Sequence, residues 1–157
     1  MKITLLCIGK TDEGFVQTGI TNYMKRLKHY INFEMLVLPD IKNVKNLSQD
    51  QQKTKEGELI LKQISTLDFV ILLDERGKEF RSLDFSKFIE QKLVSSVNHL
   101  VFVIGGPYGF SPEVYARASQ QISLSKMTFS HQMIRMFFVE QLYRAFTIMR
   151  NEPYHHE

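Results

Sequence analysis

Short apolar runs alternate along this chain with stretches in which hydrophobic residues recur at helical spacing. Four of the five runs are mostly unalternating, which is typical of strands buried on both faces, and the last run is weaker. The runs cover residues 3–8, 33–38, 68–73, 99–105 and 121–125. Each of them predicts a strand.

The stretches between these runs predict helices. Residues 14–30 place Val16, Ile20, Tyr23, Met24 and Leu27 on one helical face. Further helices are expected after a capping-box pair, after a capping serine, after a serine followed by proline, and in a long final segment. The capping-box pair is Ser48 with Gln51, for a helix to about residue 65. The capping serine is Ser82, the serine followed by proline is Ser111-Pro112, and the long final segment covers residues 131–150.

The alternation of strands and helices predicts the fold class and the place of a ligand. It indicates an α/β fold with a mainly parallel sheet and helices on both faces, in a single domain over residues 1–157. Ligands bind such sheets at the carboxyl ends of the strands. Three loops are therefore candidates: "DERGKEF" after residue 73, "GGPYGFSPE" after residue 104 and "SKMTFSH" after residue 124.

The final helix is apolar on nearly every side. Phe138, Leu142, Phe146 and Met149 form one stripe, and other large apolar residues occupy much of the opposite side. A helix that is apolar all round must be buried all round, and in a small domain the second face calls for a second chain. We therefore expect a homodimer with a helical interface that is the same on both subunits.

Composition narrows the class of protein only slightly. The chain has 157 residues, 43% of them hydrophobic and 24% charged, with a net charge of +3. That balance permits a polyanionic partner without requiring one. The single cysteine, Cys7, lies in an apolar run and excludes a disulfide framework. We expect no membrane span, because the apolar runs are too short, and a cytoplasmic location, because the N-terminus resembles a strand rather than a signal peptide.

Two apparent phosphate-binding motifs fail on inspection. "IGKT" at residues 8–11 lacks the earlier glycine of a P-loop, and "GGPYG" at 105–109 has the wrong spacing for a dinucleotide fingerprint. The glycine pair can form a simple turn or let the backbone approach a flat ligand. "LSKMTF" at 124–129 can read an adenine edge through main-chain groups or can be an ordinary connection. Adjacent His155 and His156 make a poor metal site, so no metal is expected.

Four polar residues on the final helix are candidate functional groups. Glu140 and Arg144 stand four residues apart, as a helical ion pair would. His131 and Arg135 have the same spacing near the start of the helix. His131 can equally be a structural hydrogen-bonding group, whereas Arg135 could present a cation to phosphate. Lys25 and Arg26 on the first helix form either an RNA-binding face or an ordinary solvated surface.

Three segments resemble one known family across essentially the whole chain. They are "MKITLLCIGK" at the N-terminus, "FVIGGPYG" in the middle and "LSKMTFSHQMIRMFFVEQLYRAFTIMRNEPYH" at residues 124–155. They are similar to the RlmH family of the SPOUT superfamily, which methylates N3 of a pseudouridine in helix 69 of 23S ribosomal RNA on the assembled ribosome. The resemblance implies a C-terminal trefoil knot, a homodimer, and S-adenosylmethionine (SAM) bound in the knot.

The resemblance also assigns a set of cofactor-binding residues. Carried over position by position, this set comprises Leu73, Gly105, Leu124, Ser125, Lys126, Met127, Thr128 and Phe129. These residues lie in or beside the three loops already selected from the strand pattern. No metal is implied.

The implied chemistry directs attention to the tail. Methyl transfer to N3 requires positioning of the base and removal of its proton, so we expect catalytic roles for His155, Tyr154, Glu140 and Arg144. RNA contacts are expected from His131, Arg135, Lys25 and Arg26. Two alternatives remain open: a ribosome- or RNA-binding module of the same fold without catalysis, and a different nucleotide-binding α/β enzyme.

Overall fold

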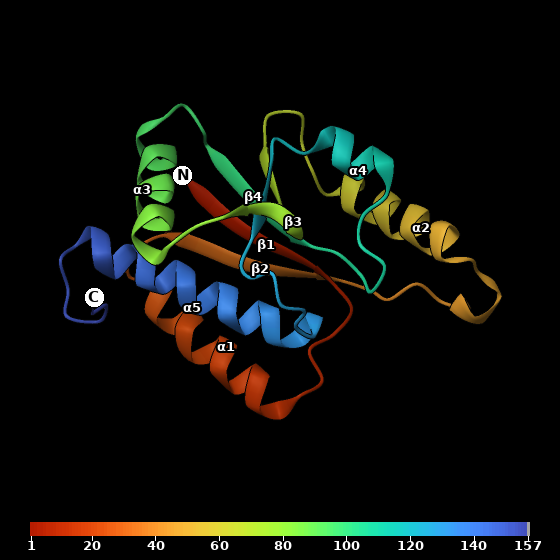
Figure 1. The fold of residues 1–157 in the computed structure, drawn as a ribbon, viewed down its shortest axis with the longest axis horizontal. Coiled ribbons are helices and arrows are strands. Elements are labelled where there is room, and N and C mark those ends of the chain that lie inside the picture. Colours follow the sequence, from red (N-terminus) through yellow and green to blue (C-terminus); the bar gives the residue numbers. More distant parts are fainter. Residues whose placement is uncertain (157) are drawn as a thin grey trace.

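Parallel strands form the centre of the molecule (Figure 1). The computed structural model describes residues 1–156, which form a five-stranded sheet in the order β2-β1-β4-β3-β5, with every neighbouring pair parallel. The strands are β1 Lys2–Ile8, β2 Asn32–Leu38, β3 Phe69–Glu79, β4 His99–Ile104 and β5 Gln120–Ser123. The predicted α/β class with a parallel sheet is confirmed. The final residue, 157, lies outside the described residues.

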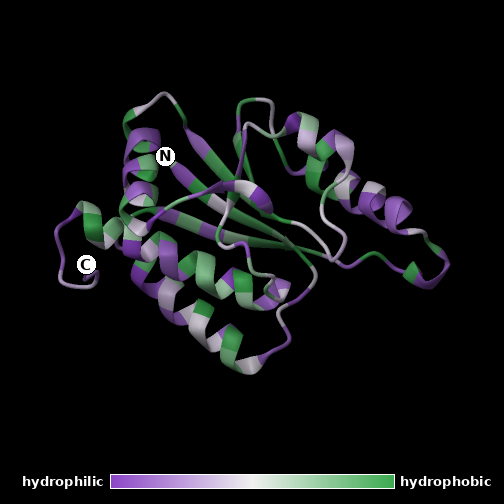
Figure 2. Ribbon diagram, in the orientation of Figure 1, coloured by the Kyte–Doolittle hydropathy of each residue, from purple (hydrophilic) through white to green (hydrophobic). Residues whose placement is uncertain are grey.

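The helices cover both faces of this sheet (Figure 1). They are α1 Gly14–Leu27, α2 Gln49–Lys62, α3 Ser82–Val94, α4 Pro112–Arg117 and α5 His131–Met149, with a short 3-10 helix, η1, at Val44–Asn46. Apolar residues of α1, α3 and α5 pack in one buried cluster against the sheet, and those of α2 and α4 pack in another. Figure 2 shows the hydrophobic residues concentrated on the central strands and the polar residues on the outer parts of α2.

Two helices begin where their sequence signals place them. Ser48 accepts a hydrogen bond from the Gln51 backbone N–H at 3.1 Å, and the Gln51 side chain accepts from the Ser48 N–H at 2.8 Å. Ser111 caps α4 by accepting from the Val114 N–H. Each cap satisfies N–H groups that a helix start leaves without partners.

The expected cap of α3 is wrong. Arg81 is the N-cap residue, and Ser82 is already the first residue of the helix. The Ser82 hydroxyl instead lies 3.1 Å from the side-chain oxygen of Gln141 on α5, to which it donates. A serine next to a helix start is therefore used here to join two helices.

Helix α5 is enclosed on several sides within the single chain. Phe138 is completely buried against the sheet. Gly19 of α1 lies so close to α5 that a Cβ atom there would be 2.4 Å from the Met136 sulfur. On the other flank, the Ser86 hydroxyl of α3 donates to the Ala145 carbonyl at 2.8 Å. The neighbouring helices α1 and α3 thus account for much of the apolar surface of α5 without a second chain.

Strand β3 is longer than the apolar pattern predicts. Its pairing with β5 does not stop at Leu73, because both Leu73 and Lys78 lie opposite Ile122. Residues 74–77 therefore form a bulge between two paired parts of the strand. A Cβ atom on Gly77 would come within 2.6 Å of the Ile122 backbone, so the chain rejoins β5 closely only because residue 77 is glycine.

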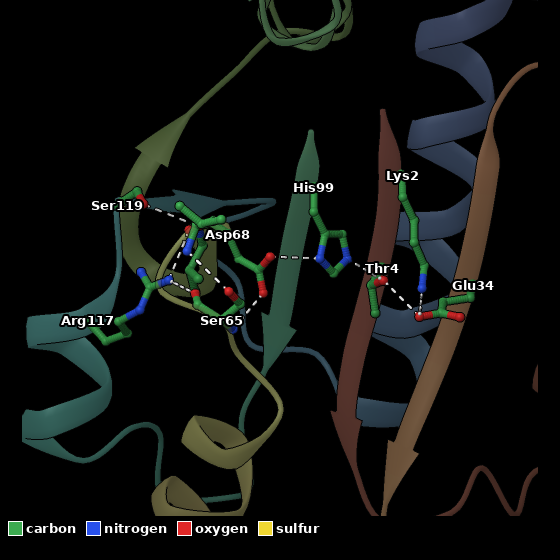
Figure 3. Close-up of polar contacts among 10 residues, drawn as sticks. Lys2, Thr4, Glu34, Ser65, Asp68, His99, Arg117 and Ser119 are labelled. Carbon is green, nitrogen blue, oxygen red and sulfur yellow. Dashed lines mark hydrogen bonds and ion pairs between the residues drawn. The ribbon is translucent and has the colours of Figure 1, made fainter. Parts of the chain in front are cut away.

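A row of polar contacts runs across the sheet near the amino ends of its strands (Figure 3). Asp68 Oδ1 lies 2.9 Å from His99 Nδ1, and His99 Nε2 lies 2.8 Å from the Thr4 hydroxyl. Thr4 donates to Glu34 at 3.1 Å, and Lys2 pairs with Glu34 at 2.6 Å. This row joins neighbouring strands near their amino ends, away from the carboxyl ends where a ligand is expected.

Candidate functional site

A cavity of about 540 Å³ opens at the carboxyl ends of β3, β4 and β5. Residues 73–76, 104–110, 123–125 and 127–129 line most of it, with His131 and Ile134 from the start of α5. We call this the loop cavity. Its volume is in the range of small-ligand sites. The structure thus brings the three candidate loops to one place.

The glycine loop, residues 105–109, has close neighbours on its outer side. A Cβ atom on Gly105 would lie 2.9 Å from the Phe110 ring, and one on Gly106 would lie 2.3 Å from Glu56 Oε2. Gly109 has a φ of +83° and donates its N–H to the Gly106 carbonyl at 3.2 Å. The loop is therefore a tight turn that also presents bare backbone to the cavity, which combines the two interpretations left open by its sequence.

The serine–lysine segment, residues 124–129, is ordered by its own side chains. The Ser123 hydroxyl donates to the Ser125 carbonyl at 2.8 Å, and the Met127 N–H donates to the Ser125 hydroxyl at 2.9 Å. Lys126 points elsewhere, with its side chain 86% exposed and its ammonium 4.0 Å from Glu79. The other seven residues of the expected cofactor set line the loop cavity: Leu73, Gly105, Leu124, Ser125, Met127, Thr128 and Phe129.

A polar group at the rim of the cavity was not expected from the sequence. Asp74 accepts hydrogen bonds from the Tyr115 hydroxyl and, at 2.9 Å, from the Arg76 backbone N–H. The Arg76 guanidinium donates to the same Tyr115 oxygen at 2.6 Å. Burial alone would raise the pKa of Asp74, but the hydrogen bonds from Tyr115 and Arg76 outweigh it and hold this pKa below its usual range.

A buried carboxyl group lies behind the glycine loop. Glu56 of α2 is 3% exposed, and its Oε1 accepts from Gln52 at 3.1 Å. Its Oε2 has no hydrogen-bond partner among residues 1–156. Burial, together with the charge of Asp40, raises the pKa of Glu56 despite the bond from Gln52. Glu56 therefore limits the space behind Gly106.

Four side chains meet at the far end of α5. Glu140 Oε1 accepts from Arg144 at 2.5 Å and from the Tyr154 hydroxyl at 2.9 Å. Arg144 also lies 3.4 Å from His155 Nδ1, and its guanidinium stacks 4.7 Å from the centre of the Tyr154 ring. We call these residues the tail cluster. They are the four expected catalytic residues, and the fold gathers them into one hydrogen-bonded group.

The charges and hydroxyls of the tail cluster shift its ionisation. Burial lowers the pKa of Arg144, but the hydrogen bond and charge of Glu140 more than offset this, so the pKa is raised. Burial and hydrogen bonds with Tyr23 and Glu140 raise the pKa of Tyr154. Tyr154 therefore remains a hydroxyl at neutral pH and acts as a hydrogen-bond donor.

Helix α1 and residue Tyr30 after it hold the tail in place. The Tyr23 hydroxyl lies 3.1 Å from that of Tyr154, and Tyr30 donates to Glu152 at 2.5 Å. The hydrogen bond from Tyr30 to Glu152, then burial, raises the pKa of Tyr30 to about 12. Arg26 lies 5.4 Å from the centre of the Tyr23 ring. An exposed cation thus borders the tail cluster, and Lys25 is exposed beside it in sequence.

The two remaining RNA candidates lie at the start of α5 and differ in exposure. His131 is exposed and lines the loop cavity. Arg135 is completely buried, and donates to the carbonyls of Ile8 at 2.5 Å and Gly9 at 2.8 Å. Its guanidinium closes the carboxyl end of β1 instead of facing a phosphate, so the structure does not present Arg135 to RNA.

The loop cavity and the tail cluster lie at opposite ends of α5. His131 lines the cavity, whereas Arg144 belongs to the tail cluster. At about 1.5 Å of rise per residue, His131 and Arg144 are roughly 20 Å apart along the helix, and the nearest members of the two regions on α5, Ile134 and Glu140, are roughly 9 Å apart. Figure 1 shows the chain leaving α5 towards the C-terminus at the end remote from the sheet's carboxyl edge. Within one chain, no residue of the tail cluster lines the loop cavity.

A parallel sheet with a ligand-sized cavity at its carboxyl ends is the arrangement in which α/β proteins bind ligands. Within residues 1–156 no group of three or more His, Cys, Asp or Glu side chains is arranged to hold a metal ion. In the same part of the chain, no helix has the length and hydrophobicity that crossing a membrane requires.

Comparison with known proteins identifies the family. Residues 1–155 match the family described as "Predicted SPOUT methyltransferase". The chain is 64% identical over 157 residues to the ribosomal RNA large subunit methyltransferase H of Parabacteroides distasonis, covering 100% of both chains. The proteins of that name in Flavobacterium johnsoniae and Christiangramia forsetii are 61% identical, over 100% of both chains, and 60% identical, over 99% of both. The chain belongs to the RlmH family of SPOUT methyltransferases.

Proposed function

We propose that this protein transfers a methyl group from SAM to N3 of a pseudouridine in helix 69 of 23S ribosomal RNA. The substrate would be the assembled ribosome, in the cytoplasm. The observation that carries the proposal is full-length similarity to proteins named as large-subunit ribosomal RNA methyltransferases. Within the chain, a cavity lined by seven of the residues expected to bind the cofactor supports it.

Several features of the loop cavity support SAM as its ligand. Bare backbone at Gly105 and Gly106 allows close approach of a flat ring, and Leu124 and Met127 supply apolar cover. SAM supplies an activated methyl group when bound. The protein's part is to bind and orient the donor and to hold the accepting nitrogen in line with it.

The tail cluster supplies the groups that manage the proton. A neutral imide nitrogen is a poor nucleophile, so N3 must lose its proton as the new bond forms. Glu140 and His155 are the candidate proton acceptors, and Tyr154, whose hydroxyl donates to Glu140, is a candidate to stack on the base. Arg144, held by Glu140 at 2.5 Å, is placed to stabilise negative charge that develops on the base.

We propose that a homodimer unites the two regions. No residue of the tail cluster lines the loop cavity of its own chain, and even the nearest members on α5, Ile134 and Glu140, are roughly 9 Å apart along the helix, beyond hydrogen-bond reach. A second copy packed antiparallel along α5 would bring its tail cluster to that cavity. The C-terminal trefoil knot implied by the family belongs to the same proposal.

The RNA would be bound along the border of the tail cluster. Arg26 is exposed and lies 5.4 Å from the Tyr23 ring, next to the residues that hold the tail. Lys25 on the same helix and His131 at the cavity are further candidates for contacts to phosphate. Because the net charge is only +3, two subunits together would supply the basic surface.

The decisive experiment uses ribosomes that lack this methylation. Incubating them with the protein and methyl-labelled SAM, followed by mapping of the modified nucleotide, should place the label on N3 of one pseudouridine in helix 69. Free 23S RNA serves as the control for the need for an assembled ribosome. Salt-dependent ribosome binding without methyl transfer would instead favour the non-catalytic module.

A further inference from the structure

Arg76 is a restrained cation at the rim of the loop cavity. Its side chain is 72% exposed, yet its Nη2 donates to the Tyr115 hydroxyl at 2.6 Å and its Nε lies 3.5 Å from Asp74 Oδ1. The guanidinium carbon lies 5.6 Å from the centre of the Tyr115 ring. These contacts use the Nε–H and one N–H of Nη2. The remaining N–H groups, on Nη1 and Nη2, can donate to a ligand at the cavity rim.

The bulge in β3 brings these residues to the cavity. Asp74, Glu75 and Arg76 follow directly after Leu73, one of the expected cofactor residues, and all four line the loop cavity. Tyr115 reaches the same rim from α4. Two separate elements therefore hold Arg76 beside the place where the donor is proposed to bind.

The charges on this rim favour a zwitterion over a polyanion. Within residues 1–156 the acidic and basic side chains, histidine aside, that line the cavity are Asp74, Glu75 and Arg76, which sum to one negative charge. A rim of that sign repels the phosphodiester backbone of RNA. SAM carries a sulfonium, an ammonium and a carboxylate, so it has one net positive charge and a single anionic group.

We propose that Arg76, positioned by Asp74 and Tyr115, binds the carboxylate of the methionine portion of SAM. The inference rests on the proposed function, because it takes SAM as the ligand of the loop cavity. It names the residue that recognises one end of that ligand. The planar guanidinium matches a carboxylate with two parallel N–H donors, which an ammonium group does not offer.

Comparing two ligands isolates the proposed contact. Decarboxylated SAM keeps the adenosine, the sulfonium and the ammonium but lacks the carboxylate. Binding of both ligands to the wild-type protein and to Arg76→Ala is measured by titration calorimetry. The substitution should weaken SAM binding about 10-fold and change decarboxylated SAM binding less than about 2-fold.

Three further variants test the positioning of the cation. Arg76→Lys keeps the charge without the planar fork and should lose about 3-fold for SAM. Tyr115→Phe removes the hydroxyl between Asp74 and Arg76 and should produce a similar, SAM-specific loss. Lys78→Ala is the matched control, because Lys78 is an exposed cation on the same strand that packs over Phe80 and not on the rim.

Several results would overturn the proposal. Equal losses for both ligands would show that Arg76 acts through the shape of the cavity. Unchanged SAM binding with a raised KM for ribosomes would show that Arg76 contacts RNA. Failure of the wild-type protein to bind SAM would remove the proposed function as well, and that outcome is distinct because it appears before any substitution.

Discussion

The loop cavity and the tail cluster are built from different chemistry at the two ends of one helix. The cavity is formed by backbone, glycines, and apolar and hydroxyl side chains, with the Asp, Glu and Arg side chains confined to its rim. The tail cluster consists of a carboxylate, a guanidinium, a phenol and an imidazole in mutual contact. One region is suited to holding a ligand, and the other is suited to moving a proton.

The difference predicts that affinity for the methyl donor and turnover of the substrate can be damaged separately. Damage to the cavity should lower the affinity for the donor, whereas damage to the tail cluster should lower turnover with the affinity intact. If the two regions meet in a dimer, each chain contributes one half of a site to its partner. Substitutions along the chain can test both statements.

The largest effect is expected from Glu140→Gln. Glu140 holds both Arg144 and Tyr154, so the neutral amide would release the arrangement of the tail cluster. We expect turnover of ribosomes to fall roughly 100- to 1,000-fold, with the Kd for SAM within about 2-fold of wild type. Single-turnover methylation and calorimetry measure the two quantities. Glu58→Gln on the exposed side of α2 is the control. A parallel loss of SAM affinity would contradict the separation.

Arg135→Met tests how much the buried arginine at the start of α5 stabilises the fold. Its loss leaves the carbonyls of Ile8 and Gly9 without their buried donors, so the free energy of unfolding should fall by about 3 kcal/mol. Chemical denaturation at fixed protein concentration provides the measurement. Arg150→Met, which removes an exposed cation over the Tyr30 ring, should change the free energy of unfolding by less than about 1 kcal/mol. Equal effects would show that the burial of Arg135 contributes little.

Gly105→Ala should affect the cavity alone. The added Cβ would lie 2.9 Å from the Phe110 ring, so the glycine loop must shift. We expect about 10-fold weaker SAM binding. Gly14→Ala is a matched control, since a Cβ at Gly14 has open space around it. A normal Kd for the Gly105 variant would show that the loop does not contact the donor.

Mixing two damaged chains tests whether they share sites. Heterodimers of the Glu140→Gln and Gly105→Ala chains would contain one site with both halves intact. At limiting SAM concentration, random mixing should restore about a quarter of wild-type activity, which neither variant shows alone. No recovery after proven subunit exchange would indicate that each chain works by itself.

Glu56→Gln should have the smallest effect, and one that depends on pH. The raised pKa of Glu56 means that its ionisation opposes folding, so wild-type stability falls as pH rises through the window above about 4. The amide does not ionise, and the variant should be more stable by about 1 kcal/mol at pH 8. The difference should vanish below about pH 4. Urea denaturation across this range measures it, and a variant less stable at pH 8 would contradict the sign.

Local patterns predicted much of the fold and part of the candidate site. The strand runs, the Ser48 capping box and the Glu140–Arg144 spacing are short-range signals, and the structure contains all three. The expected burial of β2 on both faces is wrong, because this strand lies at the edge of the sheet and exposes Glu34, Leu36 and Val37. The end of β3 was not predictable, because the apolar run stops at Leu73 while the strand continues through polar residues. Its continuation depends on pairing with β5, a contact between distant parts of the chain.

Long-range contacts also explain what the sequence could not show at the site. The burial of Arg135 depends on the end of β1, which lies more than a hundred residues away in sequence. The bond between Asp74 and Tyr115 joins a strand bulge to a later helix. Arg76 stands in a polar stretch of sequence and Arg135 in an apolar one, but neither local context shows which groups the guanidinium contacts.

The bulge at residues 74–77 has a consequence for how this surface can change over evolution. Because β3 resumes its pairing with β5 at Lys78, the bulged residues can be exchanged without altering the alignment of the sheet. Gly77 is constrained by the nearby Ile122 backbone, and Asp74 and Arg76 are constrained by their contacts with Tyr115. The exposed position between them, Glu75, could thus diversify among descendants while the architecture around it is inherited intact.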